Sequence, residues 1–264
     1  MQSETIRRLG VRLYIGVFFL YLLIPLSIMS LATFNDSRFP TVYPWKGFTL
    51  KWCSALVQDM RMWQALWTSI VVAIGVLVVA VPIGICCALF LSTVQGKGKT
   101  LIYSMMMSPL LTPGIIIGIS TLIFWKHFDV TGGIVLTVIA QTTFIAAYVM
   151  LMVLARLQRF DRTFENAALS LGATQWQTFR RILLPYLKPA VISAAGLAFL
   201  QSFENYHTTL FVRGSDSTLT LYIATKVRLG STPAVNALGL VMIVLTVMLA
   251  IVYAIKRRRA LAIL

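Results

Sequence analysis

Glu204 is a carboxylate inside a long apolar run, and two other polar side chains, Asn205 and His207, follow it closely. Because an ionised carboxylate in a bilayer is costly, such a group must be paired, protonated or open to a water-filled path. It could attract a cationic solute along a translocation path. It could also be a structural partner of Arg213 or of a neighbouring subunit. The residues leave both interpretations open.

Residue patterns for catalysis or metal binding are missing from the sequence. There is no P-loop and no glycine-rich phosphate cradle, so we do not expect the chain to hydrolyse ATP. Two histidines, His127 and His207, cannot form a metal cluster by themselves. Cys53, Cys86 and Cys87 show neither a disulfide framework nor metal-ligand spacing. We therefore expect a protein that is not an enzyme and carries no cofactor.

The elements that must position Glu204 are apolar segments of membrane length. The chain has 264 residues, of which 58% are hydrophobic and 12% charged, and its mean hydropathy of +0.84 is too high for a soluble domain. We predict an all-α polytopic membrane protein with one transmembrane domain, 1–264. A cleaved signal is the alternative for the first apolar run, but this run is longer than a signal-peptide core. The six predicted spans are about 13–34, 66–91, 101–125, 134–154, 190–210 and 235–255.

The third predicted span contains Pro109 and Pro113 within the run SPLLTPG. Each proline removes a backbone hydrogen bond and clashes one turn back, so the segment cannot be a regular helix. A broken helix is typical of solute paths in transporters, but a packing kink with its free carbonyls satisfied by Ser108 or Thr112 is the alternative. The prolines alone do not decide between these two roles.

The net charge of +15 is distributed unevenly along the chain. With six spans, most of the 23 Lys and Arg residues fall on the side that holds the N-terminal tail, the QGKGK loop, loop 155–188 and the C-terminus. The positive-inside rule places that side, and therefore both termini, in the cytoplasm. The charge thus indicates orientation in a lipid membrane, and we expect no nucleic-acid partner.

Loop 155–188 contains a stretch, Glu165 to Pro185, that reads as two short helices joined at a glycine. Gly172 ends the first helix, for which Asp161 or Thr163 is the candidate cap. Thr174 and Gln177 have the spacing of a capping box and open the second helix, which Pro185 is expected to close. The predicted apolar positions are Phe164, Ala167, Ala168 and Leu171 on the first helix and Trp176, Phe179, Ile182 and Leu183 on the second.

This stretch resembles the cytoplasmic coupling loop of ABC importer permeases, which reads EAA, three residues, Gly, nine residues, Ile, one residue and Leu-Pro. Asn166 stands where the family usually has Glu, and Glu165 precedes it. The resemblance implies that this loop docks on an ATPase subunit. The residues that match or flank the motif are Glu165, Asn166, Ala167, Ala168, Gly172, Ile182, Leu184 and Pro185.

Over nearly its whole length the chain is most similar to the spermidine/putrescine type of ABC importer permease. Further matches are SPLLTPG, Glu204-Asn205 after LAFLQSF, and STPAVNAL. The resemblance implies the type I, MetI-like permease fold in a bacterial inner membrane. It also implies a second, similar permease subunit, two cytoplasmic ATP-binding subunits, an extracytoplasmic solute-binding protein, and a polyamine or similar cationic solute. The translocation path would involve Glu204, Asn205, His207, Pro109 and Pro113.

Two other classes of protein remain as alternatives. An ATP-independent secondary transporter or channel would need ion-coupling carboxylates or an internal repeat, and the chain offers one embedded carboxylate and no clear repeat. A membrane scaffold would need neither a broken helix nor a buried Glu. Co-purification of a nucleotide-binding subunit distinguishes an ABC permease from both.

Overall fold

The computed structural model describes residues 2–230 and 233–261, and these form an all-helical chain apart from one isolated bridge between Asn35 and Phe48. Two compact units can be separated, one made of Met1–Met62 and Ile223–Leu264 and the other of Trp63–Tyr222. The single transmembrane domain, 1–264, stays a prediction. The elements are α1 Gln2–Thr33, α2 Lys51–Gln58, α3 Met60–Thr93, α4 Lys97–Leu111, α5 Gly114–Lys126, α6 Ile134–Leu157, α7 Thr163–Ser170, α8 Gln175–Thr178, η1 Phe179–Leu183, α9 Leu184–Phe203, α10 Thr209–Val212, α11 Leu219–Arg228 and α12 Pro233–Leu261.

The unit that contains both chain ends consists of α1, α2, α12 and the loop between α1 and α2. Gly239 on α12 allows close packing with α1, because a Cβ there would lie 2.6 Å from Met29 Cε. The loop is organised by the buried amide of Asn35, whose Nδ2 donates to the carbonyls of Thr41 and Pro44 at 2.9 and 3.1 Å. The predicted loop with its short helix is therefore ordered by its own polar contacts.

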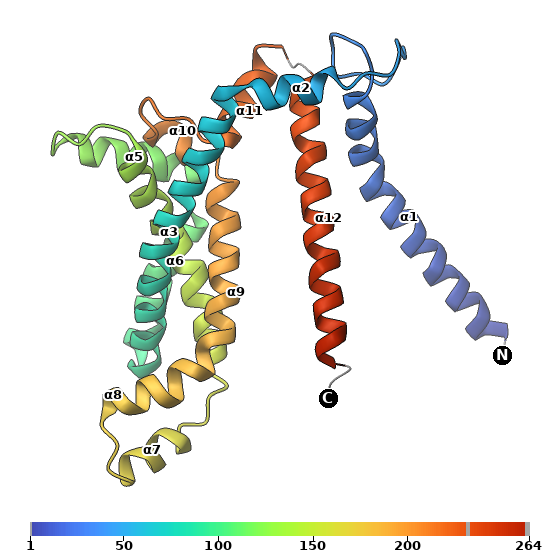
Figure 1. Cartoon of the computed structure of the whole chain (residues 1–264). Helices are drawn as coiled ribbons and strands as arrows, with labels where there is room; N and C mark the ends of the chain where they lie inside the picture. The colour runs from blue at the N-terminus through green and yellow to red at the C-terminus, as the bar shows by residue number, and fades with distance from the viewer. Residues whose placement is uncertain (1, 231–232, 262–264) are drawn as a thin grey trace. The chain divides into compact units, whose positions relative to one another are not determined.

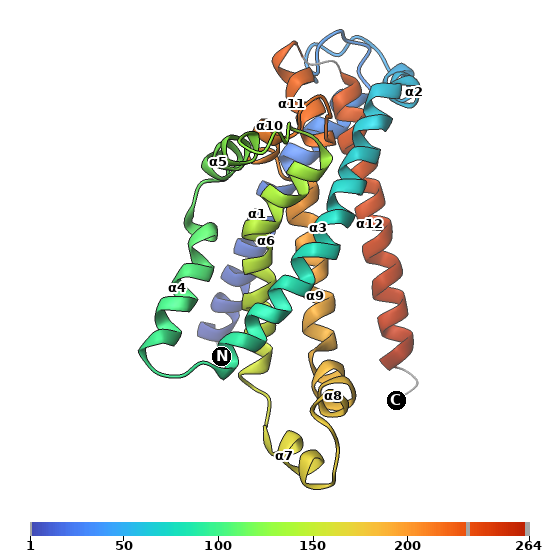
Figure 2. The same ribbon diagram turned by 90° about the vertical axis from the view of Figure 1, so that its left-hand side faces the viewer.

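The other unit is built around α3, α6 and α9, which run side by side (Figures 1 and 2). Its core consists of small and branched apolar residues, with Val76, Ile145 and Leu187 fully buried. Gly84 brings α3 close to α6, because a Cβ there would lie 2.8 Å from the carbonyl oxygen of Ala146. Helices α7 and α8 lie at one end of these three helices and α5 and α10 at the opposite end (Figures 1 and 2).

The break predicted in the third span is confirmed, and its place is specific. The two halves, α4 and α5, meet at an angle of 100°. Pro109 lies inside α4, whereas Thr112 is extended with ψ 127° and Pro113 precedes the first residue of α5. The bend occurs at Pro113, because the residue before a proline is disfavoured in the helical region.

Four described helical stretches are long and apolar enough to cross a membrane, and the bent pair makes a fifth if it counts as one span. They are Arg7–Thr33, Met60–Thr93, Ile134–Leu157 and Gln175–Phe203. The first three agree with the predicted spans 13–34, 66–91 and 134–154. In the predicted last span, the apolar part found is the shorter stretch Pro233–Met248, so the count of six is not confirmed.

Two predictions about the fifth span are wrong. Pro185 does not close a helix, because the chain stays helical from Gln175 to Phe203. A π-helical turn allows this, with the Leu184 N–H donating to the carbonyl of Phe179 five residues back and Pro185 in the first turn of α9. The span also ends at Phe203 rather than near Leu210, since the chain from Glu204 to Thr208 leaves the helical path.

Candidate functional site

Gly172 ends α7 as the sequence predicts. Its φ of +87° lies in the left-handed region, which a residue with a Cβ rarely adopts. The Gly172 N–H donates to the carbonyl of Leu169 and the Ala173 N–H to that of Ala168, both at 3.0 Å. These two bonds form a Schellman motif, which satisfies the carbonyls at the end of the helix. The turn between the short helices is therefore defined by backbone geometry.

The predicted capping box at α8 is also confirmed. Thr174 Oγ1 accepts from the Gln177 N–H at 3.2 Å, and Gln177 Oε1 accepts from the Thr174 N–H at 2.9 Å. Because both partners are local, the second helix starts at a fixed distance from Gly172. The glycine and the box together set the angle between α7 and α8.

At the start of α7 the N-cap position is Arg162, which makes no side-chain cap bond, and the capping carboxylate comes from Asp161 one residue earlier rather than from Thr163. Asp161 Oδ1 accepts from the Thr163 N–H at 2.9 Å. Hydrogen bonds from the side chain and backbone of Thr163 lower the pKa of the Asp161 carboxyl. A lowered folded-state pKa stabilises the fold above the unfolded-state pKa, and this stabilisation is lost as the pH falls through the folded-state value. The cap is therefore complete at neutral pH.

The two short helices expose an apolar surface, which we call the loop tip. It consists of Phe164, Leu171 and Trp176, whose exposed fractions are 61%, 88% and 65%. The predicted apolar stripe of α7 thus faces outward, and no described residue of α7 is buried. Trp176 stacks on Phe179 with ring centroids 5.6 Å apart, which limits its motion. An exposed apolar surface of this kind is typical of an interaction site.

The motif residues fall into two groups. Ala167, Asn166, Leu184 and Pro185 are exposed, whereas Glu165, Ala168 and Ile182 are half-buried. Glu165 lies in the first turn of α7, where a negative charge is favourable.

Two arginines that the motif does not include attach the loop to the long helices. Arg156, in the last turn of α6, lies over the ring of Tyr186 on α9 at 4.1 Å, and the Tyr186 hydroxyl donates to the Arg156 carbonyl at 3.3 Å. Arg162 Nη2 donates at 3.0 Å to the carbonyl of Ser92 near the end of α3. Sequence reasoning does not find these contacts, because their partners lie 30 and 70 positions away. We call Arg156 and Tyr186 the clasp.

Glu204 does not lie within a span, which corrects the prediction. It is the C-cap of α9, and its side chain is exposed. In the described ranges 2–230 and 233–261 it makes no ion pair, and Arg213 instead donates to the carbonyl of Asp216 at 2.9 Å. His207 is also exposed and contacts the ring of Tyr206. Asn205 has a structural role, since its Oδ1 accepts from Thr209 Oγ1 at 3.0 Å.

The two helix breaks of this unit lie next to each other. A Cβ on Gly114, which follows Pro113, would be 2.9 Å from Thr208 Oγ1 and 3.4 Å from His207 Cβ. The structure therefore brings the proline break beside the segment 204–208, while Pro109 stays within α4. Gln141 on α6 donates a hydrogen bond to Thr209, the residue that follows this segment. The sequence predictions do not include Gln141, and its position as a Gln inside an apolar span is the one signal that could have found it.

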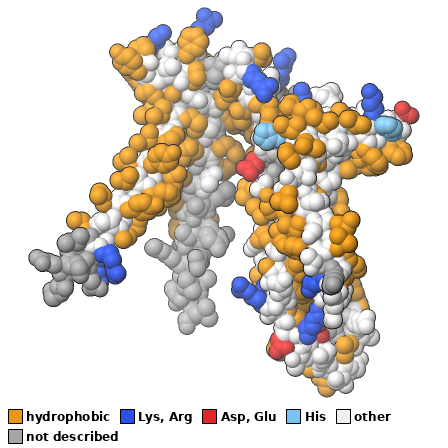
Figure 3. Space-filling model, turned by 180° about the vertical axis from the view of Figure 1, so that it is seen from behind, with side chains coloured by type: hydrophobic (Ala, Val, Ile, Leu, Met, Phe, Trp, Pro, Cys, Tyr) orange, Lys and Arg blue, Asp and Glu red, His pale blue; other side chains and the backbone are white. Residues whose placement is uncertain are grey.

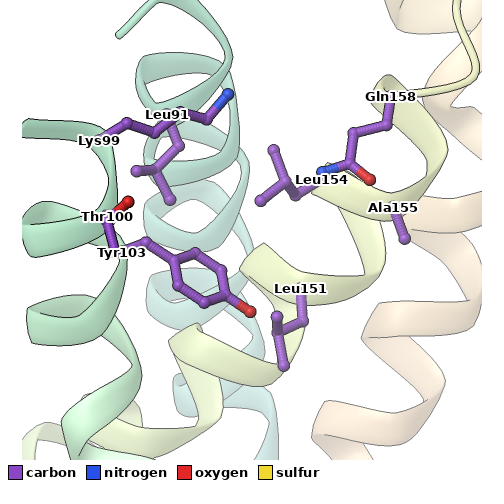
Figure 4. A pocket seen from close by; sticks show the side chains of 8 residues that line it. All are labelled: Leu91, Lys99, Thr100, Tyr103, Leu151, Leu154, Ala155 and Gln158. Atoms are coloured by element: carbon purple, nitrogen blue, oxygen red, sulfur yellow. The ribbon is translucent and has the colours of Figure 1, made fainter. Parts of the chain in front are cut away.

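A cavity of about 450 Å³ lies between α3, α4 and α6 (Figure 4). None of the predicted site residues lines it. No group of three His, Cys, Asp or Glu side chains able to hold a metal occurs in the part of the chain that the structure describes. The lining residues are Leu91, Lys99, Thr100, Tyr103, Leu151, Leu154, Ala155 and Gln158.

Membrane-length helices that carry an exposed, glycine-hinged pair of short helices at one end define a subunit of a membrane transport system. The chain belongs to the family described as binding-protein-dependent transport system inner membrane component, whose model matches residues 80–261.

Curated relatives support this assignment. The spermidine/putrescine transport system permease protein PotC of Escherichia coli (strain K12) is 32% identical over 239 residues, which cover 90% of each chain. The putrescine transport system permease protein PotI of the same organism is 32% identical over 235 residues, covering 86% of this chain and 82% of the relative. The chain is similar to these permeases over most of its length.

Solved structures show the same fold. A bacterial ABC transporter involved in the import of the acidic polysaccharide alginate matches with a TM-score of 0.71 at 14% identity, covering 98% of both chains. The MetNI methionine ABC transporter matches with a TM-score of 0.57 at 19% identity, covering 81% of this chain and 99% of that one. At such identities the likeness concerns the fold alone.

Proposed function

We propose that the chain forms half of the translocation path of an ATP-driven importer for a polyamine or similar cationic amine, and that the loop tip receives the work of a cytoplasmic ATPase. The observation that carries the proposal is the loop itself. A Schellman turn at Gly172 and a capping box at Thr174 hold two short helices rigidly, and their apolar residues are exposed. A rigid projection with an apolar surface suits docking into a cleft of a partner.

The clasp supports the transmission of force. It joins the end of α6 to the start of α9 through a cation–π contact and two hydrogen bonds, so a displacement of the loop moves both helices together. These two helices pack along their length and α9 leads to Glu204. In this proposal the second permease subunit, two ATP-binding subunits and the extracytoplasmic solute-binding protein complete the transporter.

The surface chemistry supports a membrane setting. Figure 3 shows hydrophobic side chains along the helices and Lys and Arg side chains mainly toward helix ends. We infer that the loop tip and both termini lie in the cytoplasm of a bacterial inner membrane, since the basic residues are concentrated in the segments on that side.

A cationic solute is favoured by the sequence relatives named for spermidine and putrescine and by the exposed carboxylate of Glu204, which forms no ion pair with any residue that the structure describes. We expect Glu204→Gln to lower the rate of spermidine uptake by about fivefold or more while the complex still assembles, because one charge contact to the cation is lost. The measurement is uptake of labelled spermidine into vesicles that contain the complete complex, normalised to complex content. An unchanged rate would remove Glu204 from the path.

Partner capture tests the rest of the proposal. The affinity-tagged chain, purified from its own membranes, is expected to bring down a second permease chain and a nucleotide-binding subunit, and the reconstituted complex is expected to hydrolyse ATP faster when the liganded binding protein is added. The matched control replaces the exposed loop-tip residues Leu171 and Trp176 by Ser, which should release the nucleotide-binding subunit but not the other permease chain. Uptake by vesicles without any nucleotide-binding subunit would instead identify an ATP-independent transporter or channel.

A further inference from the structure

A chain of buried hydrogen bonds joins three helices beside Glu204. Ser202 Oγ donates to Gln141 Oε1 at 2.6 Å, and Gln141 Nε2 donates to Thr209 Oγ1 at 2.7 Å. The Thr209 hydroxyl in turn donates to Asn205 Oδ1 at 3.0 Å. The side chains of Gln141 and Thr209 are fully buried, with exposed fractions of 0%. We call these four residues the polar chain.

Along the polar chain, each donor meets an acceptor on the next side chain. The amide of Gln141 accepts from one helix through its oxygen and donates to another through its nitrogen, which no apolar side chain and no carboxylate can do at once. Asn205 Oδ1 also accepts from the Thr209 N–H at 3.2 Å, and the Asn205 carbonyl accepts from Thr220 Oγ1 at 3.2 Å. Because buried polar groups that lose one partner are costly, the set is expected to hold one geometry.

The polar chain spans the break between α9 and α10. Ser202 lies in the last turn of α9 and Thr209 is the first residue of α10, so Gln141 holds both sides of the break to α6. The exposed residues Glu204 and His207 lie between these two attachment points. The position of Glu204 therefore depends on a side chain of another helix.

The break is also packed against α5. Thr208 is fully buried, but its Oγ1 has no hydrogen-bond partner among the described residues. Its backbone is held by shape, because a Cβ on Gly118 of α5 would lie 2.7 Å from the Thr208 carbonyl oxygen. Close contact with α5 excludes other backbone conformations of the break but does not fix its orientation relative to α6. The hydrogen bonds of Gln141 are directional and do fix that orientation.

We propose that Gln141 is a positioning residue for solute passage: with Thr209 it fixes the break 204–208 to α6, so that Glu204 is presented to the solute and moves with the helix that carries the clasp. The proposal rests on the proposed function, since it concerns the path at Glu204. Gln141 does not contact the solute itself. Its effect on transport is exerted through Glu204.

The first test measures the break itself and needs no solute. In the complete complex with Cys53, Cys86 and Cys87 replaced by Ser, Thr208→Cys is expected to react slowly with a maleimide, because position 208 is buried. Adding Gln141→Leu or Thr209→Val should raise the labelling rate by about fivefold or more, because either change removes two side-chain hydrogen bonds that oppose opening of the break. The control is Thr143→Val, since Thr143 on the same helix donates only to its own helix, to the carbonyl of Ala140 at 2.7 Å. Equal labelling in all four proteins would overturn the proposal.

The second test separates positioning from a general structural role. Spermidine uptake per complex is compared for Gln141→Leu, Glu204→Gln and the double variant. If Gln141 acts through Glu204, the double variant is expected to be no slower than Glu204→Gln alone, within about twofold, because coupled residues are not additive. Fully additive losses would overturn the positioning role.

Failure of the proposed function and failure of the positioning role of Gln141 give different results. A wild-type complex that takes up no spermidine would remove the polyamine from the proposed function. The labelling test and the ATP hydrolysis stimulated by the binding protein would still decide the role of Gln141. The decisive result is a rise in labelling of Gln141→Leu with no change in the ATP hydrolysis stimulated by the binding protein, and with the same effect of Glu204→Gln on that hydrolysis whether or not Gln141 is replaced. In that case the polar chain has only a structural role and the proposal is wrong.

Discussion

At the residue scale, Gly172 has a role that depends on its backbone alone. A Cβ at this position would meet no atom within 4 Å, so no packing argument forbids a larger residue. The constraint is the φ of +87°, which costs a residue with a Cβ about 1–2 kcal/mol. The residue therefore controls the angle between α7 and α8 through its backbone conformation.

Gly172→Ala is expected to lower the uptake rate while the complex still assembles, because the strained turn relaxes and the loop tip changes its angle. The measurement is the ratio of solute transported to ATP hydrolysed in proteoliposomes. The matched control is Gly196→Ala on α9, where a Cβ also meets nothing within 4 Å but the backbone is helical. That change is expected to be neutral or to stabilise by about 0.5–1 kcal/mol. Equal ratios in both variants would contradict a rigid hinge.

At the element scale, the clasp joins α6 and α9 at the end from which the loop projects. Its arginine makes a cation–π contact at 4.1 Å and donates from Nε to the Tyr186 carbonyl at 3.4 Å, whereas its tyrosine hydroxyl makes a hydrogen bond at 3.3 Å, so the contributions of the two side chains can be removed separately. The π-helical turn before α9 lets the chain continue as one helix from the loop into the bundle. In the proposed mechanism, force on the loop tip would reach α9 directly and α6 through the clasp.

Arg156→Ala is expected to uncouple the complex, so that ATP hydrolysis continues at about the wild-type rate while uptake falls by about tenfold. This is the effect of losing roughly 1–2 kcal/mol from the cation–π contact together with the Nε hydrogen bond to the Tyr186 carbonyl. Tyr186→Phe keeps the ring and loses only the hydroxyl bond, so its loss of uptake is expected to be smaller. Parallel measurement of ATP hydrolysis and uptake in proteoliposomes checks both. If hydrolysis and uptake fall in proportion, the clasp is structural and does not couple.

At the scale of the whole molecule, the proposed orientation places the loop tip in the cytoplasm and the loop between α1 and α2 on the opposite side. Leu171 and Tyr43 are equally exposed, each with an exposed fraction of 88%, which makes them a matched pair of reporters. In a background without the three native cysteines, Leu171→Cys is expected to react with a membrane-impermeant maleimide only in inverted vesicles and Tyr43→Cys only in right-side-out vesicles. The reverse pattern would overturn the coupling proposal.

Much of the fold was predictable because it depends on neighbours in the chain. Membrane-length apolar runs predict α1, α3 and α6, and the turn at Gly172 and the box at Thr174 are confirmed because their partners lie within five positions. The break at Pro113 was predictable for the same reason, because it depends on the proline and the residue before it. The family motif adds the proposed docking role of the loop, which spacing alone indicates only as a pair of short helices.

The sequence by itself therefore determined the membrane class, the broken helix and the hinged loop, since each follows from the conformational limits of a few consecutive residues. Only the tertiary structure decided that the chain stays helical through Pro185, that Glu204 lies at a helix end, and that Arg156 and Gln141 hold distant segments. The contacts of Arg156 and Gln141 join residues 30 and 68 positions apart, and their geometry is set by the packing of whole helices. No local pattern in the chain encodes that packing.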